Sequence, residues 1–179
     1  MGYTTDFTGY FDITPSLKDE HRDYLLAFAE SRRMGLDPKL AAEISDPIRE
    51  AADLPVGKEG EFVTAVEDGW NRPRHPAVID YNKPPSTQPG LWNHWVPNGD
   101  GSILEWDGGE KFYRYVEWLQ YVMERFLIPW DYKVEGEVEW QGEDSDDRGK
   151  IQLKGEEMTV FQVEIVYTRA NRVLLRARR

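Results

Sequence analysis

Two segments near opposite ends of the chain alternate between apolar and polar side chains. From residue 5 to residue 13 the odd positions are mostly apolar and the even positions mostly polar, and residues 134–141 have the same alternation. A period of two predicts β-strands with one buried and one solvated face. The second strand is expected to carry Glu135, Glu137 and Glu139 in a row on its solvated face.

Two other segments have the spacing of amphipathic helices. Apolar side chains recur at helical intervals over residues 17–33, after Ser16, which is a suitable N-cap. A stronger apolar face extends to Pro129, and Asp107 with Glu110 is predicted to cap its start. We therefore expect two main helices.

Turn signals predict two hairpins. Residues 91–96 and 102–106 are expected to pair, because the intervening PNGDG contains two tight-turn dipeptides. Residues 151–153 and 161–167 are expected to form a closing hairpin with a turn near Gly155.

The pattern breaks down over residues 36–89. One or two short helices are expected between Pro38, Pro47 and Pro55, and a proline-rich stretch follows. Proline cannot donate to a strand ladder and restricts the residue before it. We expect an irregular excursion over the surface, and long segments of this kind are often functional.

The order of these elements predicts the fold class. Strand, helix, insertion, strand, strand, helix, strand and a further hairpin is the split β-α-β arrangement of a ferredoxin-like antiparallel sheet. We predict a single α+β domain over residues 1–168, with two main helices, a long insertion at about 36–89 and an extra C-terminal hairpin. Residues 169–179 are predicted to be a separate arginine-rich tail.

Composition excludes several classes of protein. The formal charge is −11, from 33 acidic and 22 basic residues, which disfavours a nucleic-acid partner. The absence of cysteine excludes disulfides, thiol catalysis and cysteine-ligated metal sites. Neither a signal peptide nor a run of eighteen apolar residues is found, so a cytoplasmic protein without membrane contact is expected.

Several stretches, including EWDGGEKFY and GEVEWQGED, resemble a family of small acidic proteins found in bacteriophages and prophages. The resemblance covers most of residues 1–154 and implies a phage setting, since no activity is established for that family. Residues 92–151 are also distantly similar to the ferredoxin-like C-terminal domain of phage- and plasmid-borne proteins of unknown function. The ending after residue 160 does not resemble the family.

Acidic residues form the first candidate site. The row on the strand at 134–141 is followed by a cluster in GEDSDDRG, and such a surface suits a basic protein partner. The cluster fails the EF-hand spacing, because Arg148 occupies the fifth position, so no metal site is predicted. The predicted partner-binding residues are Glu135, Glu137, Glu139, Glu143, Asp144, Asp146 and Asp147.

Aromatic residues form the second candidate site. Residues 90–127 contain four of the seven tryptophans, and most are expected in the core because large aromatics dominate small cores. On a strand, Trp92 and His94 would share one face. With Tyr81 of the insertion, they are the predicted contacts of a small molecule held between the sheet and residues 55–90.

Catalytic motifs are missing from the sequence. The three histidines lack metal-ligand spacing, and neither G-x-S-x-G nor a phosphate-binding glycine loop occurs. Arg32 and Arg33 are explained by the dipole of the first helix. No catalytic residue and no cofactor are therefore predicted.

Three functions remain open at this stage. The leading hypothesis is an accessory protein that binds a host or phage protein through its acidic surface, for example to inhibit a host defence or nucleic-acid-binding protein. The alternative is a small-molecule or nucleotide-binding domain with an aromatic pocket. A third is an enzyme that uses clustered carboxylates and a divalent ion.

Overall fold

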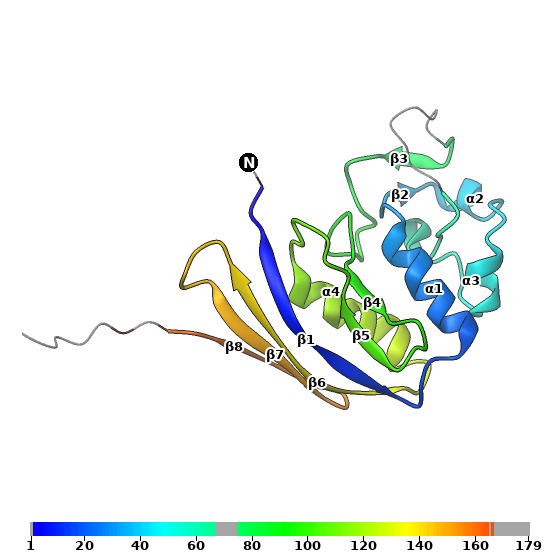
Figure 1. Ribbon diagram of the computed structural model, residues 1–179. Helices are drawn as coiled ribbons and strands as arrows, with labels where there is room; N and C mark the ends of the chain where they lie inside the picture. The colour runs from blue at the N-terminus through cyan, green and yellow to red at the C-terminus, as the bar shows by residue number, and fades with distance from the viewer. Residues whose placement is uncertain (1, 67–74, 165, 167–179) are drawn as a thin grey trace, which may run out of the picture.

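A six-stranded antiparallel sheet forms the centre of the computed structural model, which describes residues 2–66, 75–164 and 166 (Figure 1). The strand order is β4-β5-β1-β6-β7-β8. The predicted α+β class with an antiparallel sheet is confirmed. The strands are β1 (Thr5–Thr14), β4 (Trp95–Pro97), β5 (Ile103–Trp106), β6 (Lys133–Gly142), β7 (Arg148–Lys154) and β8 (Glu157–Gln162).

The core lies between one face of this sheet and two helices, α1 (Asp19–Glu30) and α4 (Tyr115–Val122). A π-helical turn, Met123–Leu127, continues α4. In Figure 1 the β7–β8 hairpin reaches away from the helices. Large aromatics dominate the core, as predicted, and Trp95 and Trp118 are both almost completely buried.

The first helix is shorter than the predicted span of residues 17–33. It begins two residues later: Lys18, its N-cap, has an extended backbone with ψ of 152°, and the backbone N–H groups of Leu17 and Lys18 hold this segment to the carbonyl of Gly101 and the hydroxyl of Tyr132. It ends at Glu30, and Ser16 is not its N-cap. Tertiary hydrogen bonds therefore set its start.

The predicted cap of the second helix is wrong. Asp107 accepts a hydrogen bond from the backbone N–H of Gly109 (2.7 Å) and contacts His94, and the helix starts only at Tyr115. Arg114 precedes it in the left-handed conformation, with φ of 56°. The predicted apolar face is confirmed within the helix.

Both predicted hairpins are present, with different bounds. In the first, the side chain of Asn93 binds the backbone of Trp95, so the strand starts at Trp95 rather than at residue 91. In the second, the turn at Gly155 places Lys154 opposite Glu157, so β8 starts four residues before the predicted strand. Residues 165 and 167–179, with the predicted arginine-rich tail, lie outside the described residues.

The insertion contains the two short helices that its prolines predicted, α2 (Pro38–Ala41) and α3 (Pro47–Ala51). A 3₁₀ turn (Lys58–Gly60) follows them. It also contains a two-stranded sheet of β2 (Gly35–Leu36) and β3 (Val78–Asp80), which the sequence did not predict. Most of its buried apolar residues form a second small cluster together with Met34: Leu36, Ala41, Val63, Val66 and Ala77.

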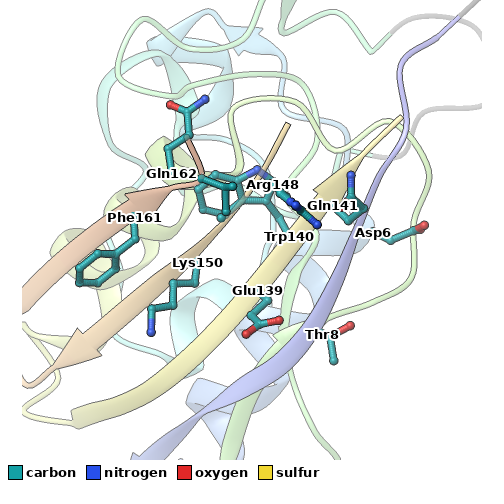
Figure 2. A pocket seen from close by; sticks show the side chains of 11 residues that line it. Asp6, Thr8, Glu139, Trp140, Gln141, Arg148, Lys150, Phe161 and Gln162 are labelled. Carbon is teal, nitrogen blue, oxygen red and sulfur yellow. The ribbon is translucent and has the colours of Figure 1, made fainter. Parts of the chain in front are cut away.

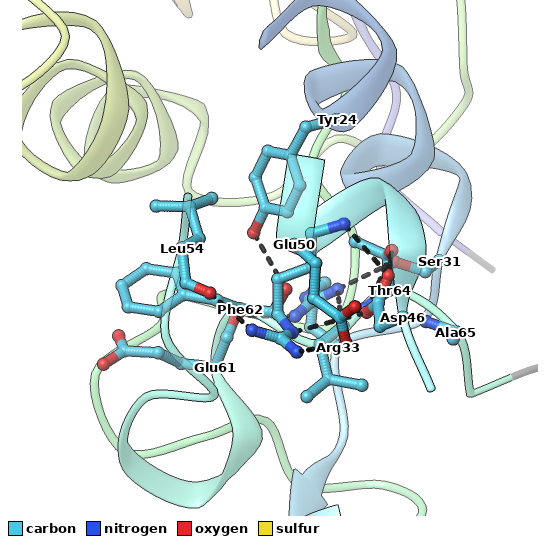
Figure 3. Close-up of polar contacts among 12 residues, drawn as sticks. Tyr24, Ser31, Arg33, Asp46, Glu50, Leu54, Glu61, Phe62, Thr64 and Ala65 are labelled. Atoms are coloured by element: carbon cyan, nitrogen blue, oxygen red, sulfur yellow. Dashed lines mark hydrogen bonds and ion pairs between the residues drawn. The ribbon is translucent and has the colours of Figure 1, made fainter. Parts of the chain in front are cut away.

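A buried arginine ties the insertion to the end of α1 (Figure 3). Arg33 is 2% exposed and donates to the carbonyls of Glu61 (2.7 Å) and Val63 (3.1 Å). Burial lowers the pKa of its guanidinium. The dipole explanation of Arg33 is therefore wrong, because the residue lies beyond the helix and serves as an internal anchor.

The insertion is fixed at a second point by Asp46, which is 1% exposed. Its carboxylate accepts hydrogen bonds from the backbone N–H groups of Thr64 (2.6 Å), Ala65 (3.2 Å) and Arg49 (3.1 Å). The segment is thus tightly bonded although it contains little regular structure.

Candidate functional site

The predicted row of glutamates lies on the solvated face of β6. Glu135 and Glu139 are exposed and Glu137 is half-buried, whereas Val134 and Val138 on the opposite face of the strand are buried against the helices. The period-two pattern therefore placed this row on the correct face. We call this side of β1, β6, β7 and β8 the open face.

Basic residues on β7 lie directly beside the glutamates. The register pairs Glu135 with Lys154 and Glu139 with Lys150, and Lys150 Nζ is 2.8 Å from Glu137 Oε2. Opposite charges across strands stabilise a sheet by roughly 0.2–1 kcal/mol per pair. The open face is therefore striped with both charges. The basic row beside the glutamates was not predicted, because the alternation in RGKIQLK indicates a strand but not the strand with which it pairs.

The other neighbour of the glutamates, β1, adds negative charge. Asp12 is directly opposite Glu135, and Asp6 is exposed near the other end of the strand. Like charges directly opposite each other destabilise a sheet. Within the described ranges neither Asp12 nor Glu135 has an ion pair, and Asp12 adds negative charge beside Glu135, whose other cross-strand neighbour is Lys154.

The predicted acidic turn is partly used to hold the N-terminal residues. Asp147 accepts hydrogen bonds from the hydroxyl of Tyr3 (2.6 Å) and the indole N–H of Trp140 (3.1 Å). The bond to Asp147 raises the pKa of Tyr3. Glu143 accepts from the backbone N–H of Thr4 (2.8 Å), whereas Asp144 and Asp146 are exposed. No cluster of three potential metal ligands occurs among the residues that the structure describes.

A shallow groove of about 430 Å³ lies on the open face at the end near this turn (Figure 2). In Figure 2 the labelled side chains around the groove come from β1, β6, β7 and β8, and Lys150 lies next to Phe161. The ammonium of Lys150 is 5.2 Å from the centre of the Phe161 ring. The groove is lined by Asp6, Thr8, Glu139, Trp140, Gln141, Arg148, Gly149, Lys150, Phe161, Gln162 and Val163.

A larger cavity of about 680 Å³ lies beside the edge strand β4. Its walls come from the segments that lead into β4 and into α4, and Trp92 and Tyr113 are 39% and 55% exposed there. Drug-sized ligands occupy cavities of roughly 300–1,000 Å³. We call this cavity the aromatic pocket; it is lined by Gly90, Leu91, Trp92, His94, Glu110, Lys111, Tyr113, Arg114 and Trp118.

A histidine–aspartate pair lies at the wall of the aromatic pocket. His94 Nδ1 is 3.0 Å from both carboxylate oxygens of Asp107. The edge of the His94 ring also meets Phe112, with ring centres 5.0 Å apart. Gly109 allows this approach, because a side chain there would overlap the imidazole. Asp107, Gly109 and Phe112 therefore fix the position of the imidazole. All three are more than ten positions from His94 in the sequence.

The predicted ligand contacts come together only in part. Trp92 and His94 line the same pocket, but Tyr81 does not. Arg32 lies between Tyr81 and Trp92: its guanidinium carbon is 4.2 Å from the centre of the Tyr81 ring and 5.7 Å from the centre of the Trp92 ring. Arg32 Nε also donates to the carbonyl of Tyr81 (3.0 Å). Tyr81 is therefore linked to Trp92 through Arg32 and does not line the pocket.

Trp118 contributes an unusual polar atom to the same region. Its side chain is fully buried, and its indole N–H has no hydrogen-bond partner within the described residues. It lies against Gly90: a methyl group added at that position would be 3.5 Å from Nε1. A buried unpaired donor costs about 1–3 kcal/mol. No pattern in the sequence indicated this, since Trp118 occupies an ordinary core position of a helix.

No family model matches the chain, and neither a curated protein nor a solved structure matches it. In the part of the chain that the structure describes, every helix is too short or too polar to span a lipid bilayer. The case for a function therefore rests on the open face and the aromatic pocket.

Proposed function

We propose that this protein binds a small planar aromatic molecule in the aromatic pocket. The observation that carries the proposal is a single cavity of ligand size that combines an exposed tryptophan, Trp92, with the oriented imidazole of His94. Apolar cavities with a few convergent polar groups are the usual sites of small ligands. This proposal takes up the small-molecule or nucleotide hypothesis drawn from the sequence, with the pocket beside β4 and with Gly90 as the one lining residue from the range 55–90.

The charges around the pocket favour a ligand with an anionic substituent. Lys111 and Arg114 line it, and Arg32 lies against Trp92 just outside. These three cations gather in a chain whose formal charge is −11. Glu110 opposes them, and Arg114 is partly neutralised by Glu117 at 3.2 Å. Lys111 and Arg32, which have no ion pair among the described residues, can pair with a carboxylate or phosphate at the rim.

Thermal melting with a panel of indole, indole-3-acetate, purine and flavin mononucleotide tests this proposal. At least one compound at millimolar concentration should raise the melting temperature, because a ligand of the folded state stabilises it by mass action. Trp92→Ala should abolish that shift while costing little stability, since Trp92 is partly exposed. Stacking on an aromatic side chain is worth about 1–3 kcal/mol.

Tyr10→Ala provides the matched control. Tyr10 is a 50% exposed aromatic residue on the open face, so its loss should leave the ligand-induced shift unchanged. If no compound raises the melting temperature, or if Trp92→Ala retains the full shift, the proposal is wrong.

A second candidate function is the binding of a basic protein through the open face, as the sequence first indicated. The specific observation in its favour is the facing pair Asp12 and Glu135, whose repulsion a cationic partner would relieve. Such a protein would act in the cytoplasm of a host cell, and inhibition of a host defence or nucleic-acid-binding protein is its most concrete form.

Charge reversal tests this second candidate. Replacing Glu135, Glu137 and Glu139 by lysine should abolish capture of a partner that wild-type protein retains at low salt and releases at high salt. Three exposed glutamates away from the open face, reversed together as Glu30→Lys, Glu43→Lys and Glu124→Lys, form the control with the same net charge. Equal capture by both triple variants would contradict the idea.

We also propose that the core of the fold is ferredoxin-like. The strands that flank the two helices along the chain, β1, β4, β5 and β6, stand side by side in the order β4-β5-β1-β6. This order supports two interleaved split β-α-β units, with β7 and β8 as an added edge. Such folds serve many unrelated functions, so the function still depends on the site.

A further inference from the structure

The two ring nitrogens of His94 have different surroundings. Nδ1 lies 3.0 Å from both oxygens of Asp107, and an ionised carboxylate can only accept hydrogen bonds. Nδ1 must therefore carry a proton. In the neutral imidazole the other nitrogen, Nε2, is then an acceptor with a free lone pair.

The environment of the pair maintains this arrangement. One carboxylate oxygen of Asp107 is already fixed by the backbone N–H of Gly109 at 2.7 Å. The Phe112 ring contacts the imidazole at an interplanar angle of 74°. The side chain of His94 is 18% exposed, so only part of the ring reaches solvent. Its orientation is therefore determined before any ligand arrives.

Nε2 is the unused polar atom of this ring. Across residues 2–66, 75–164 and 166, no hydrogen-bond partner is found for it, and it is not among the buried unpaired atoms, so it remains accessible. His94 and Trp92 line the same cavity. An oriented acceptor beside an exposed indole ring is suited to a ligand that stacks on the ring and donates at its edge.

We propose that the ligand of the aromatic pocket is a planar heteroaromatic molecule that donates a ring N–H to His94 Nε2. The proposal rests on the function proposed above and adds the hydrogen-bonding character of the ligand. Asp107 acts in it as a positioning residue, because it holds the proton on Nδ1 and keeps Nε2 free to accept. Trp92 supplies the stacking surface, which is indifferent to the ring N–H.

Indole and 1-methylindole are matched probes, since they differ in the ring N–H that the proposal requires. Their dissociation constants can be measured by ligand-observed NMR titration at neutral pH. Wild-type protein should bind indole about two- to tenfold more tightly than 1-methylindole, as one net hydrogen bond predicts. In His94→Phe, which retains a ring against Phe112 but has no hydrogen-bond acceptor, the two dissociation constants should be about equal.

Asp107→Asn tests the positioning role without removing the imidazole. The backbone N–H of Gly109 would hold the amide oxygen, so the amide NH₂ would face Nδ1 and favour a proton on Nε2. The preference for indole should then shrink while the affinity for 1-methylindole stays the same. A merely structural role would weaken both probes equally. His75→Phe, an exposed histidine outside the pocket, should change neither value.

The outcomes separate the two proposals. If wild-type protein binds both probes equally and Trp92→Ala binds neither, the pocket is a ligand site but the donor to His94 is wrong. If wild-type protein binds neither probe, this inference fails, whereas the proposed function fails only if no compound of the melting panel stabilises the protein. If the preference persists in His94→Phe, the ring N–H is recognised by another group and the inference is overturned.

Discussion

The aromatic pocket and the open face of the sheet differ in how far their polar groups are paired within the protein. On the open face, register places Lys150 and Lys154 beside the glutamates of β6, so much of the charge is neutralised within the protein. In the pocket, His94 Nε2 and the Trp118 indole N–H have no partner within the described part of the chain. The open face compensates much of its charge internally, whereas the pocket has unused hydrogen-bonding capacity.

This difference shows why net charge alone is a weak guide to function here. The formal charge of −11 first drew attention to the glutamate row, yet part of that row is compensated by the next strand. The pocket has no comparable signature in composition. Polar atoms that a fold orients and leaves unpartnered are a more specific indication of a site than the number of charges on a surface.

The largest loss of stability is expected from Arg33→Leu, a change that lies next to the pocket and away from the open face. Arg33 anchors the insertion, and its backbone N–H donates to the carbonyl of Leu91 in the pocket wall. Loss of its guanidinium leaves the buried carbonyl of Val63 unpaired and removes one of the two donors to the carbonyl of Glu61, so the free energy of unfolding should fall by about 3 kcal/mol. Urea denaturation measures this change, and binding of indole to the pocket should weaken as well.

Arg32→Leu is the control for this prediction. Arg32 is the adjacent residue, but it is only half-buried and mainly contacts aromatic faces, so its loss should cost less than about 1 kcal/mol. Equal destabilisation by the two variants would mean that Arg33 is not a special anchor.

His21 should account for a smaller, pH-dependent loss of stability that belongs to neither region. It stacks on Trp130 with ring centres 3.9 Å apart, and burial lowers its pKa below the ordinary value of 6.5. The unfolded chain therefore binds the proton more readily. The stability that neutral His21 contributes is fully present above about pH 6.5, and it is lost as the pH falls through the lower pKa of His21 in the folded state.

His21→Phe keeps the stacking but cannot be protonated, so it should lose less stability than wild type between pH 7.5 and pH 5. Urea unfolding at the two pH values measures the difference. His75→Phe, at an exposed position, should behave like wild type. A wild-type pH dependence that survives in His21→Phe would assign the titration to another group.

The smallest effect is expected on the open face, from the pair Glu137 and Lys150. A double-mutant cycle with Glu137→Gln and Lys150→Met should give a coupling energy of roughly 0.2–1 kcal/mol, because both side chains are more than a third exposed. The coupling should decrease in 1 M salt, where exposed charges are screened. Coupling that salt does not reduce would mean that the face is less solvated than its exposure indicates.

Local patterns predicted the strands and their faces well. The alternation around Glu137 identified both the extent and the solvated side of β6, because a strand's two faces depend on residues next to each other in sequence. The short helices between the prolines were also predicted correctly. The start of α1 was not, since the donors that fix it reach residues more than eighty positions away.

The candidate site was predicted only in part, for a physical reason. Trp92 and His94 were identified as contacts, but Asp107 was interpreted as a helix cap, a role that its residue type suits equally well. Its contact with a histidine thirteen positions earlier depends on how the β4–β5 hairpin closes. Lys111 and Tyr113 were assigned to a helix that begins later, so their place in a pocket wall could not be read from periodicity.

The internal anchor at Arg33 has a consequence for how the chain opens. A segment as long as the insertion, with few strands and helices of its own, would ordinarily be expected to exchange its amide protons by local fraying. Arg33 and Asp46 bond to its backbone from buried positions. Releasing the segment would therefore either leave a buried charge without its hydrogen bonds or let water enter the core. Residues 61–65 should therefore exchange on the slow timescale of the central sheet, as part of one cooperative unit.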